Sequence, residues 1–265
     1  MIWGKNMIYD LQKASIMKRI AAGIFDLILT VIIAVGVMWL LSAIFNLDSY
    51  SKQMEEYVEE YSVKYNIDIK KFSKMDLETY ESTYSKEERA FHAQIEKEMQ
   101  KDDRILKAYS LWYNLTIIMV TLGVLIGVLV IEFVVPLILG NGQTIGKKCF
   151  SICVMMQNGV KLKTFPLLAR SLLGKFTIET MIPCYIFAMR FLGKGNDFQI
   201  ILLLGLGILQ LALIITNPFN TLLHDSLSFT TVVDKESQMI FETEDDLIKY
   251  KEKIALETEA KKRTF

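Results

Sequence analysis

Several charged side chains stand within or beside apolar stretches of this sequence, where an isolated charge is unfavourable. Arg19 stands directly before the first apolar stretch and Asp26 lies within it, Glu132 lies in the second, and the pair His224–Asp225 follows the last. A charge near the centre of a bilayer costs roughly 2.5–3.5 kcal/mol on insertion scales, so each group should face protein or water and have a partner. A carboxylate in such a low-dielectric layer can hold a raised pKa and exchange a proton or a cation.

The spacing of these residues predicts that they lie at one level. Asp26 follows Arg19 by seven residues, which is ~10 Å along a helix, and the two residues share one helix face. Glu132 and Glu179 lie at comparable depths in later apolar stretches. We therefore expect a cluster in the inner-leaflet layer. Two hypotheses remain open: a proton- or cation-linked site, or a network of ion pairs that only holds the helices in place.

The second apolar stretch ends in the sequence NGQTIGKK, which looks at first like a nucleotide-binding loop. The phosphate-binding P-loop requires GxxxxGK followed by Ser or Thr. Asn141 stands where the first glycine belongs, and Lys148 stands where the hydroxyl belongs. We therefore predict that no nucleotide binds here.

Residues for catalysis or metal binding form no recognisable pattern. His92 and His224 are the only histidines, and no nucleophile stands near His224–Asp225. The three cysteines, Cys149, Cys153 and Cys184, match no metal-ligand spacing. We predict that the protein is not an enzyme and has no catalytic residue, no metal site and no cofactor. The 30 basic and 30 acidic residues balance, and no basic stripe with aromatic residues indicates a nucleic-acid partner.

Four apolar stretches are candidates for membrane helices: residues 20–45, 111–139, 177–193 and 199–216. A spanning helix needs about 20 residues to cross ~30 Å of hydrocarbon. The third stretch is short and contains Glu179, Pro183 and Arg190, so it either crosses the membrane or only enters it. We predict an all-α transmembrane protein with about four membrane helices, whose main partner is the lipid bilayer.

The loop between the second and third stretches determines the predicted orientation. Residues 140–175 contain five lysines and one arginine but no acidic residue, which places this loop and the N-terminus in the cytoplasm. Within the loop, Asn158–Gly159 predicts the turn of a small β-hairpin. The segment 164–176 predicts a short amphipathic helix on the bilayer surface, with Arg170 and Lys175 facing lipid phosphates. Residues 228–233 predict a strand that pairs with the hairpin and brings Asp225 beside Arg19 or Lys147.

A charged insert separates the first two membrane helices. Apolar and aromatic residues recur at helical spacing around 54–65 and again around 91–99, with a connection at 66–76 between them. We therefore predict an extracytoplasmic helical hairpin. The charged tail is predicted to be helical near residues 243–260.

Taken together, the motifs resemble the RDD family of bacterial membrane proteins. The resemblance is carried by Arg19 with Asp26, by EFVVPLILGNGQTIGKK, and by LLHDSLSFTTVV, and it covers about residues 15–45 and 110–235. It implies that Arg19, Asp26 and Asp225 are the arginine and the two aspartates of the family name. It also implies that Gly142, Thr144, Gly146 and Lys147 match the family's GxTxGK block, and that Arg170 matches its helix arginine. The long insert departs from the usual family pattern.

These observations predict four regions and one leading function. The regions are a leader with the first membrane helix (1–45), the extracytoplasmic insert (46–110), the membrane core with its cytoplasmic loop (111–233) and a cytoplasmic charged tail (234–265). The family resemblance implies a multi-pass protein of the bacterial plasma membrane that acts in transport or cation/proton coupling. Arg19, Asp26, Glu132 and Asp225 would form the site, with Asp26 and Glu132 as the proton or cation ligands. The alternative is a non-catalytic scaffold or assembly factor that binds a partner through the insert or tail. A homo-oligomer or another membrane protein is left open as the partner.

Overall fold

The structure is a computed structural model that describes residues 11–191 and 195–263, and it is mostly helical. The chain divides into two compact units. The first unit consists of residues 1–34 and 124–265, and the second consists of residues 35–123. All of the clustered charged residues discussed above belong to the first unit.

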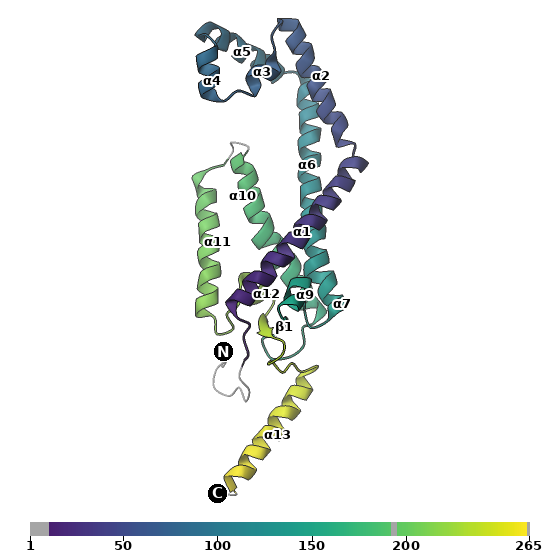
Figure 1. Cartoon of the computed structure of the whole chain (residues 1–265), viewed down its shortest axis with the longest axis vertical. Coiled ribbons are helices and arrows are strands. Elements are labelled where there is room, and N and C mark those ends of the chain that lie inside the picture. Colours follow the sequence, from purple (N-terminus) through teal and green to yellow (C-terminus); the bar gives the residue numbers. More distant parts are fainter. Residues whose placement is uncertain (1–10, 192–194, 264–265) are drawn as a thin grey trace. The chain divides into compact units, whose positions relative to one another are not determined.

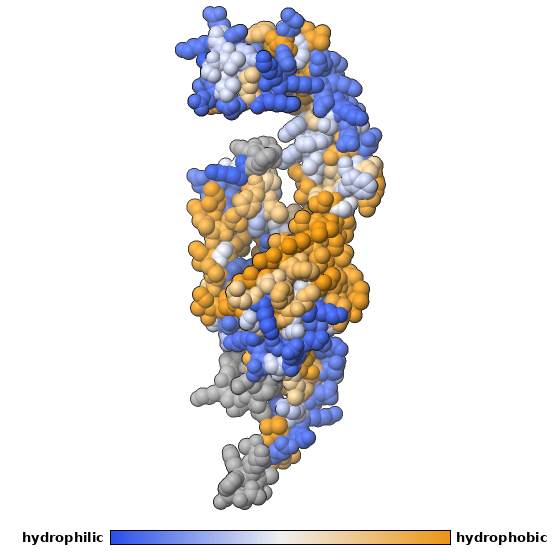
Figure 2. Space-filling view, viewed as in Figure 1, coloured by the Kyte–Doolittle hydropathy of each residue, from blue (hydrophilic) through white to orange (hydrophobic). Residues whose placement is uncertain are grey.

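Four helical segments are long and apolar enough to cross a membrane: Ile16–Ile44, Asp103–Leu139, Thr164–Arg190 and Asp197–Thr216. The first is α1 (Ile16–Ile44) and the fourth is α11 (Asp197–Thr216), both shown in Figure 1. Their apolar side chains point outward, with Ile208 and Leu204 more than half exposed, and hydrophobic residues cover the visible faces of both helices in Figure 2. An apolar surface of this kind is stable in lipid, because lipid is itself apolar. The number of helices that are long and apolar enough to cross a membrane thus agrees with the predicted four.

The second and third segments each contain a wider, π-helical part. The second consists of α6 (Asp103–Leu129), the π-helical turn η1 (Val130–Val134) and α7 (Val135–Leu139). The third consists of α9 (Thr164–Ala169), the π-helix η2 (Arg170–Met181) and α10 (Ile182–Phe191). Such insertions into α-helices are frequent at functional sites. Both π-helical parts contain members of the charged cluster.

The predicted division of the third segment into a surface helix and a separate weak span is wrong. Residues Thr164–Arg190 form one continuous helical segment that starts well before residue 177. Arg170, which was expected to face lipid phosphates, is only 1% exposed. The physical reason is that a charge on an otherwise apolar helix can turn inward when protein supplies its counter-ion, and periodicity alone does not distinguish that from a surface position.

A small antiparallel sheet joins the loop to the end of the family-like region. Strand β1 (Ile152–Met156) pairs with β2 (Thr230–Asp234), with Val154 opposite Val232. The predicted pairing of the 228–233 strand is therefore confirmed. The predicted hairpin forms only in part: the turn closes between Met156 and Gly159, but the return segment makes isolated bridges instead of a strand. Strand β2 and the return segment both pair with β1, since Met155 lies opposite Thr231 of β2 and also bridges to Lys161.

The start of the chain is attached to the same sheet. The Ala14 amide donates to the Val232 carbonyl at 3.2 Å, the Asp234 amide donates to the Gln12 carbonyl at 2.9 Å, and Lys13 bridges to Val233. These bonds hold the beginning of α1 next to β2. Two short helices flank the sheet, α8 (Ile145–Cys149) before β1 and α12 (Leu223–Leu227) before β2.

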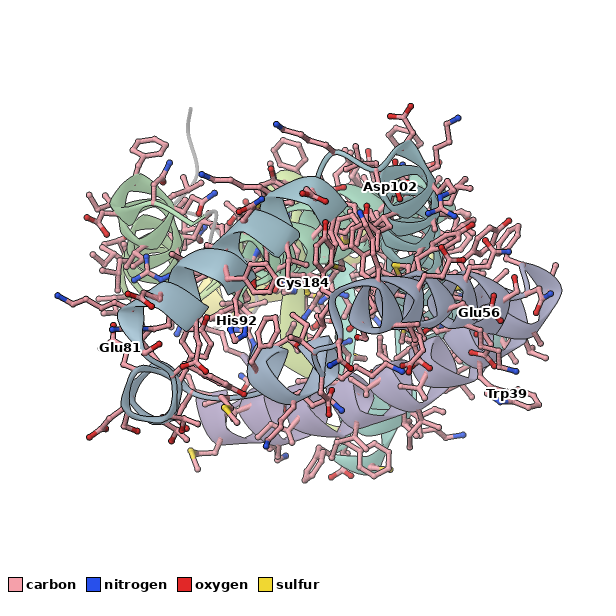
Figure 3. All side chains as sticks on the ribbon, turned by 90° about the horizontal axis from the view of Figure 1, so that it is seen from above. Trp39, Glu56, Glu81, His92, Asp102 and Cys184 are labelled. Carbon is pink, nitrogen blue, oxygen red and sulfur yellow. The ribbon has the colours of Figure 1, made fainter. Side chains whose placement is uncertain are left out.

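The insert contains four helices, so the prediction of a two-helix hairpin is wrong. They are α2 (Leu47–Tyr65), α3 (Ile69–Ser73), α4 (Leu77–Thr83) and α5 (Lys86–Met99). Asp68, Asp76 and Ser85 cap the last three through their side chains, which is the signal that starts a new helix after each break. His92 lies inside this unit, where its ring stacks on Phe72 with centroids 4.1 Å apart (Figure 3). The expected connection at 66–76 thus contributes its own helix and core residues.

The tail forms α13 (Glu244–Arg263), which confirms the helix predicted near residues 243–260. Its first turns are attached to the sheet region, because Leu247 packs with Phe241 and Val160.

Candidate functional site: a buried charge cluster

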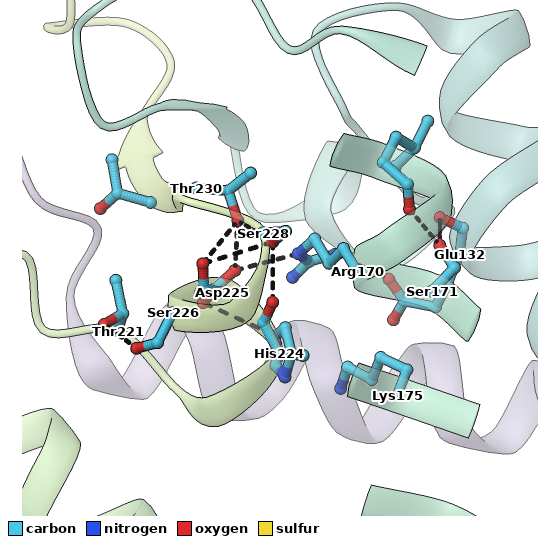
Figure 4. A network of polar contacts seen from close by, with 12 residues as sticks. Glu132, Arg170, Ser171, Lys175, Thr221, His224, Asp225, Ser226, Ser228 and Thr230 are labelled. Atoms are coloured by element: carbon cyan, nitrogen blue, oxygen red, sulfur yellow. Dashed lines mark hydrogen bonds and ion pairs between the residues drawn. The ribbon is translucent and has the colours of Figure 1, made fainter. Parts of the chain in front are cut away.

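Arg170 is the centre of the cluster. Its Nε donates to Asp225 Oδ1 at 2.9 Å, and its Nη1 donates to Glu132 Oε2 at 3.0 Å (Figure 4). Three elements meet here, because Arg170 begins η2, Glu132 lies in η1 and Asp225 lies in α12. Ser171 Oγ adds a bond of 2.7 Å to the Glu132 carbonyl, which holds the two π-helical parts together. Arg170 therefore acts as an internal counter-ion and has no surface role.

Asp225 receives a second cation from α1. Arg19 Nη2 donates to Asp225 Oδ2 at 3.1 Å, and Arg19 Nη1 donates to the Asn220 carbonyl. Thr230 Oγ1 donates to Asp225 Oδ1 at 3.2 Å. Of the two partners predicted for Asp225, the structure selects Arg19. The attachment of the N-terminal segment to β2 brings α1 close enough for this contact.

Asp26 is held by the loop that follows the second membrane segment. Its Oδ1 accepts from the Gly146 amide at 2.8 Å, and its Oδ2 accepts from Thr144 Oγ1. A Cβ atom at position 146 would lie 2.4 Å from the Ala22 carbonyl oxygen, so only glycine allows α8 to approach α1 this closely. Thr144 also caps α8. The GQTIGK segment thus binds the Asp26 carboxylate through the Thr144 hydroxyl group and the Gly146 amide.

Lys147 lies between the two carboxylates expected as ligands. Its Nζ is 3.1 Å from Glu132 Oε2, 3.3 Å from Thr144 Oγ1 and 3.9 Å from Asp26 Oδ2. The side chain is buried, as are both acids. An ammonium group surrounded by three oxygens occupies the kind of position that a metal cation could also fill.

Arg19 and Asp26 share a helix face but do not pair with each other. Arg19 bonds to Asp225 and Asn220, whereas Asp26 bonds to the Thr144–Lys147 segment. The structure therefore brings the four predicted site residues into one connected cluster through Arg170 and Lys147. The glycine at 142, in the same motif, has φ +60° and packs against Val154 and Leu162.

A second group of contacts, between Glu179 and His224, was not predicted. His224 Nδ1 lies 2.7 Å from Glu179 Oε1, and His224 Nε2 lies 3.5 Å from Asp225 Oδ2. Gln210 Nε2 donates to Glu179 Oε1 at 2.7 Å, and Lys175 Nζ is 3.6 Å from Glu179 Oε2. Each of these residues can be recognised in the sequence as a polar residue in or near an apolar stretch. Their pairing cannot be recognised there, because it joins three separate elements.

Two cavities adjoin the cluster. The first, of about 440 Å³, is lined by Arg19, Asp26, Glu132, Lys147, Glu179 and His224 together with apolar residues of α1 and α11. The second, of about 380 Å³, is lined by Ile178, Glu179, Pro183, Leu203, Leu206, Gly207 and Gln210. Among the described residues, no group of three or more His, Cys, Asp or Glu side chains is arranged to hold a metal ion.

Burial and charge set the protonation of the groups outside the membrane segments. Burial lowers the pKa of Lys147 below its usual 10.5, although Glu132 and Asp26 partly oppose this effect. Burial also lowers the pKa of His224 below 6.5, despite the carboxylates on either side. Burial disfavours the Asp225 anion, but the positive charges facing it, including Arg170 and Arg19, hold its pKa well below 3.8. Lys147 and His224 therefore lose a proton more easily here than they would in water.

Acidification is expected to destabilise the folded protein through His224. The folded-state pKa lies below 6.5, so as the pH falls below 6.5 the unfolded state binds more protons than the folded state. One such group costs up to about 1.4 kcal/mol of stability per pH unit until its folded pKa is reached. The Asp225 contribution persists in this range and is lost only as the pH falls below 3.8 towards its lower folded pKa. Melting temperatures of detergent-purified protein should therefore fall less steeply below pH 6.5 in His224→Gln than in wild type. Parallel curves would contradict the expectation.

Comparison with known proteins supports the motif assignment. The model of the RDD family matches residues 13–228, a range that includes every residue of the cluster. The resemblance inferred from the motifs is thereby confirmed. No curated protein and no solved structure matches the chain.

Proposed function

The chain belongs to the RDD family, and we propose that this membrane protein exchanges a monovalent cation for a proton at the position of the Lys147 ammonium group. The observation that carries the proposal is the arrangement around Lys147 Nζ. Three oxygens, from Glu132, Thr144 and Asp26, lie 3.1–3.9 Å from this one nitrogen. Carboxylate and hydroxyl oxygens are suitable ligands for a hard cation.

Charge balance at the site supports a one-for-one exchange. Asp26 and Glu132 carry two negative charges, and Lys147 and Arg170 carry two positive charges in contact with them. When Lys147 releases a proton, the set has one excess negative charge in a buried layer, which is unfavourable. Entry of one monovalent cation restores neutrality, so the proton and the cation compete for the same place. Burial lowers the pKa of Lys147, which makes this release easier than from a lysine in water.

The remaining charged contacts would hold the site and control access to it. The Arg19–Asp225–Arg170 chain connects α1, α12 and η2, so movement of α1 against η2 requires these pairs to rearrange. The 440 Å³ cavity provides room for a hydrated cation next to Asp26 and Glu132. Only N–H and O–H bonds change in this scheme, and we accordingly propose that the protein is not an enzyme.

We also propose that the protein lies in the bacterial plasma membrane with both termini in the cytoplasm and the insert outside. The basic loop 140–175 favours this orientation by the positive-inside rule. A reporter that works only in the cytoplasm should be active when it is fused after Lys161. Labelling of that site from outside the cell would exclude the proposed orientation.

The function is tested with purified protein in proteoliposomes. Wild type should take up Na⁺ or K⁺ when a pH gradient is imposed, with matching proton movement. Asp26→Asn keeps the side-chain shape but removes a ligand charge, so exchange should fall by at least tenfold while the protein still purifies in folded form. Wild-type vesicles that move neither cation would exclude the exchanger. They would favour the scaffold hypothesis, in which the insert or the tail binds a partner.

A further inference from the structure

Glu179 lines both of the cavities described above. Among the described lining residues, it is the one shared by the 440 Å³ cavity and the 380 Å³ cavity. The first cavity also contains Lys147, where the exchanged proton would be released. The second is otherwise lined by apolar residues of η2, α10 and α11, together with Gln210. A carboxylate that lines both cavities can exchange a proton with either of them.

The contacts of Glu179 are arranged unequally on its two oxygens. Oε1 faces three donors: Gln210 Nε2 at 2.7 Å, His224 Nδ1 at 2.7 Å and the His224 amide at 3.3 Å. Oε2 faces Lys175 Nζ at the longer distance of 3.6 Å. Oε1 is thus the oxygen in contact with His224, and Oε2 has a single, longer contact with a lysine.

His224 extends this contact into the charge cluster. Its Nδ1 faces Glu179, and its Nε2 faces Asp225 Oδ2 at 3.5 Å. The charged groups that act on it are Asp225 on α12 itself and Glu179, Lys175 and Arg170 on η2, while Gln210 of α11 is neutral. A ring with one nitrogen towards each carboxylate can pass a proton by gaining it on one nitrogen and losing it from the other.

The backbone is adapted to bring His224 against η2. A Cβ atom at Gly174 would lie 2.4 Å from His224 Cβ and 2.5 Å from its Cα, so any larger residue would displace α12. Gly174 lies within the π-helical part, and so does Glu179. The wide helix and the missing side chain together create the space in which the two residues meet.

We infer that Glu179 and His224 form a proton-exchange station that links the two cavities, which is an inference resting on the proposed function. A proton released into the first cavity binds to His224 Nε2, the proton on Nδ1 passes to Glu179 Oε1, and the Glu179 carboxyl group then releases it to the second cavity. Each step forms one N–H or O–H bond as another breaks, and no electrons are transferred. The station handles only the proton, because Asp26, Glu132 and Thr144 hold the cation elsewhere.

Two transport modes in proteoliposomes separate the station from the cation site. Exchange of labelled Na⁺ for unlabelled Na⁺ at equal pH needs the cation site but no net proton transfer. Exchange of Na⁺ for H⁺ under a pH gradient needs both the cation site and net proton transfer. In Glu179→Gln the rate of Na⁺/Na⁺ exchange should stay within about twofold of wild type, and the rate of Na⁺/H⁺ exchange should fall at least tenfold. Glu179→Asp should recover part of the Na⁺/H⁺ exchange. Where K⁺ is the transported ion, labelled Rb⁺ replaces Na⁺.

The controls distinguish the possible failures. Glu242→Gln makes the same substitution at an exposed ion pair with Lys161 and should change neither mode. Glu179→Gln that loses both modes equally, or neither, overturns the station while leaving the exchanger intact. A wild type without either mode overturns the exchanger and the station with it. If Glu179→Gln does not purify in folded form, His224→Gln carries the same expectation and the same test.

Discussion

Arg170→Met is expected to destabilise the protein by about 3–5 kcal/mol, the cost of removing one member from a buried set of ion pairs. Methionine preserves most of the side-chain volume, so the loss would come from charge. Glu132 and Asp225 would each lose one of two cationic partners, since Lys147 and Arg19 remain in contact with them. Both acids are buried, and their charge would be compensated less well than before.

The measurement is the thermal or denaturant-induced unfolding of detergent-purified protein. Arg190→Met is the matched control, because Arg190 faces Asp197 at 4.0 Å with more than half of its side chain exposed. Exposed pairs contribute about 0–1 kcal/mol, so this variant should remain close to wild type. Adding Glu132→Gln to Arg170→Met should reduce the loss, because the cluster then holds two cations, Arg19 and Lys147, and two carboxylates, Asp26 and Asp225. Equal losses at positions 170 and 190 would show that Arg170 is not buried in an ion-pair network.

Lys147→Gln is expected to abolish cation/proton exchange and to make cation binding independent of pH. In wild type the proton on Lys147 competes with the cation, so apparent affinity should rise with pH up to the folded pKa of Lys147. The dependence can reach tenfold per pH unit, because one proton is released for each cation bound. Above that pKa the affinity should become constant. Burial lowers the pKa below 10.5, which extends the constant region to lower pH.

Binding of labelled Na⁺ to purified protein across pH 6–9 tests this expectation. In Lys147→Gln the site keeps the charges of Asp26, Glu132 and Arg170, a net charge of −1, and should bind the cation at every pH. Lys148→Gln is the control: the neighbouring lysine is exposed and should retain the wild-type pH dependence. A Lys147→Gln protein whose affinity still changes with pH would exclude Lys147 as the competing group.

Local features of the sequence determined the membrane class and the identity of the buried charges. Four apolar stretches are recognisable because the bilayer requires length and hydrophobicity, both of which are properties of consecutive residues. Arg19, Asp26, Glu132 and Asp225 stand out for a similar reason, since a charge within an apolar stretch is unfavourable unless it has a partner. The strand that became β2 and the helix of the tail were likewise visible in local patterns.

Tertiary structure alone decided which of these charges are partners. Arg19 shares a helix face with Asp26, yet it bonds to Asp225, which is 206 residues away. Arg170 has the sequence context of a surface helix, yet it joins Glu132 to Asp225 inside the protein. Periodicity reports which side of a helix a residue occupies, but it carries no information about which element packs on that side. The attachment of residues 12–14 to β2, the close approach at Gly146 and the contact of Gly174 with His224 supply that information, because they set which helices are near enough for their charges to meet.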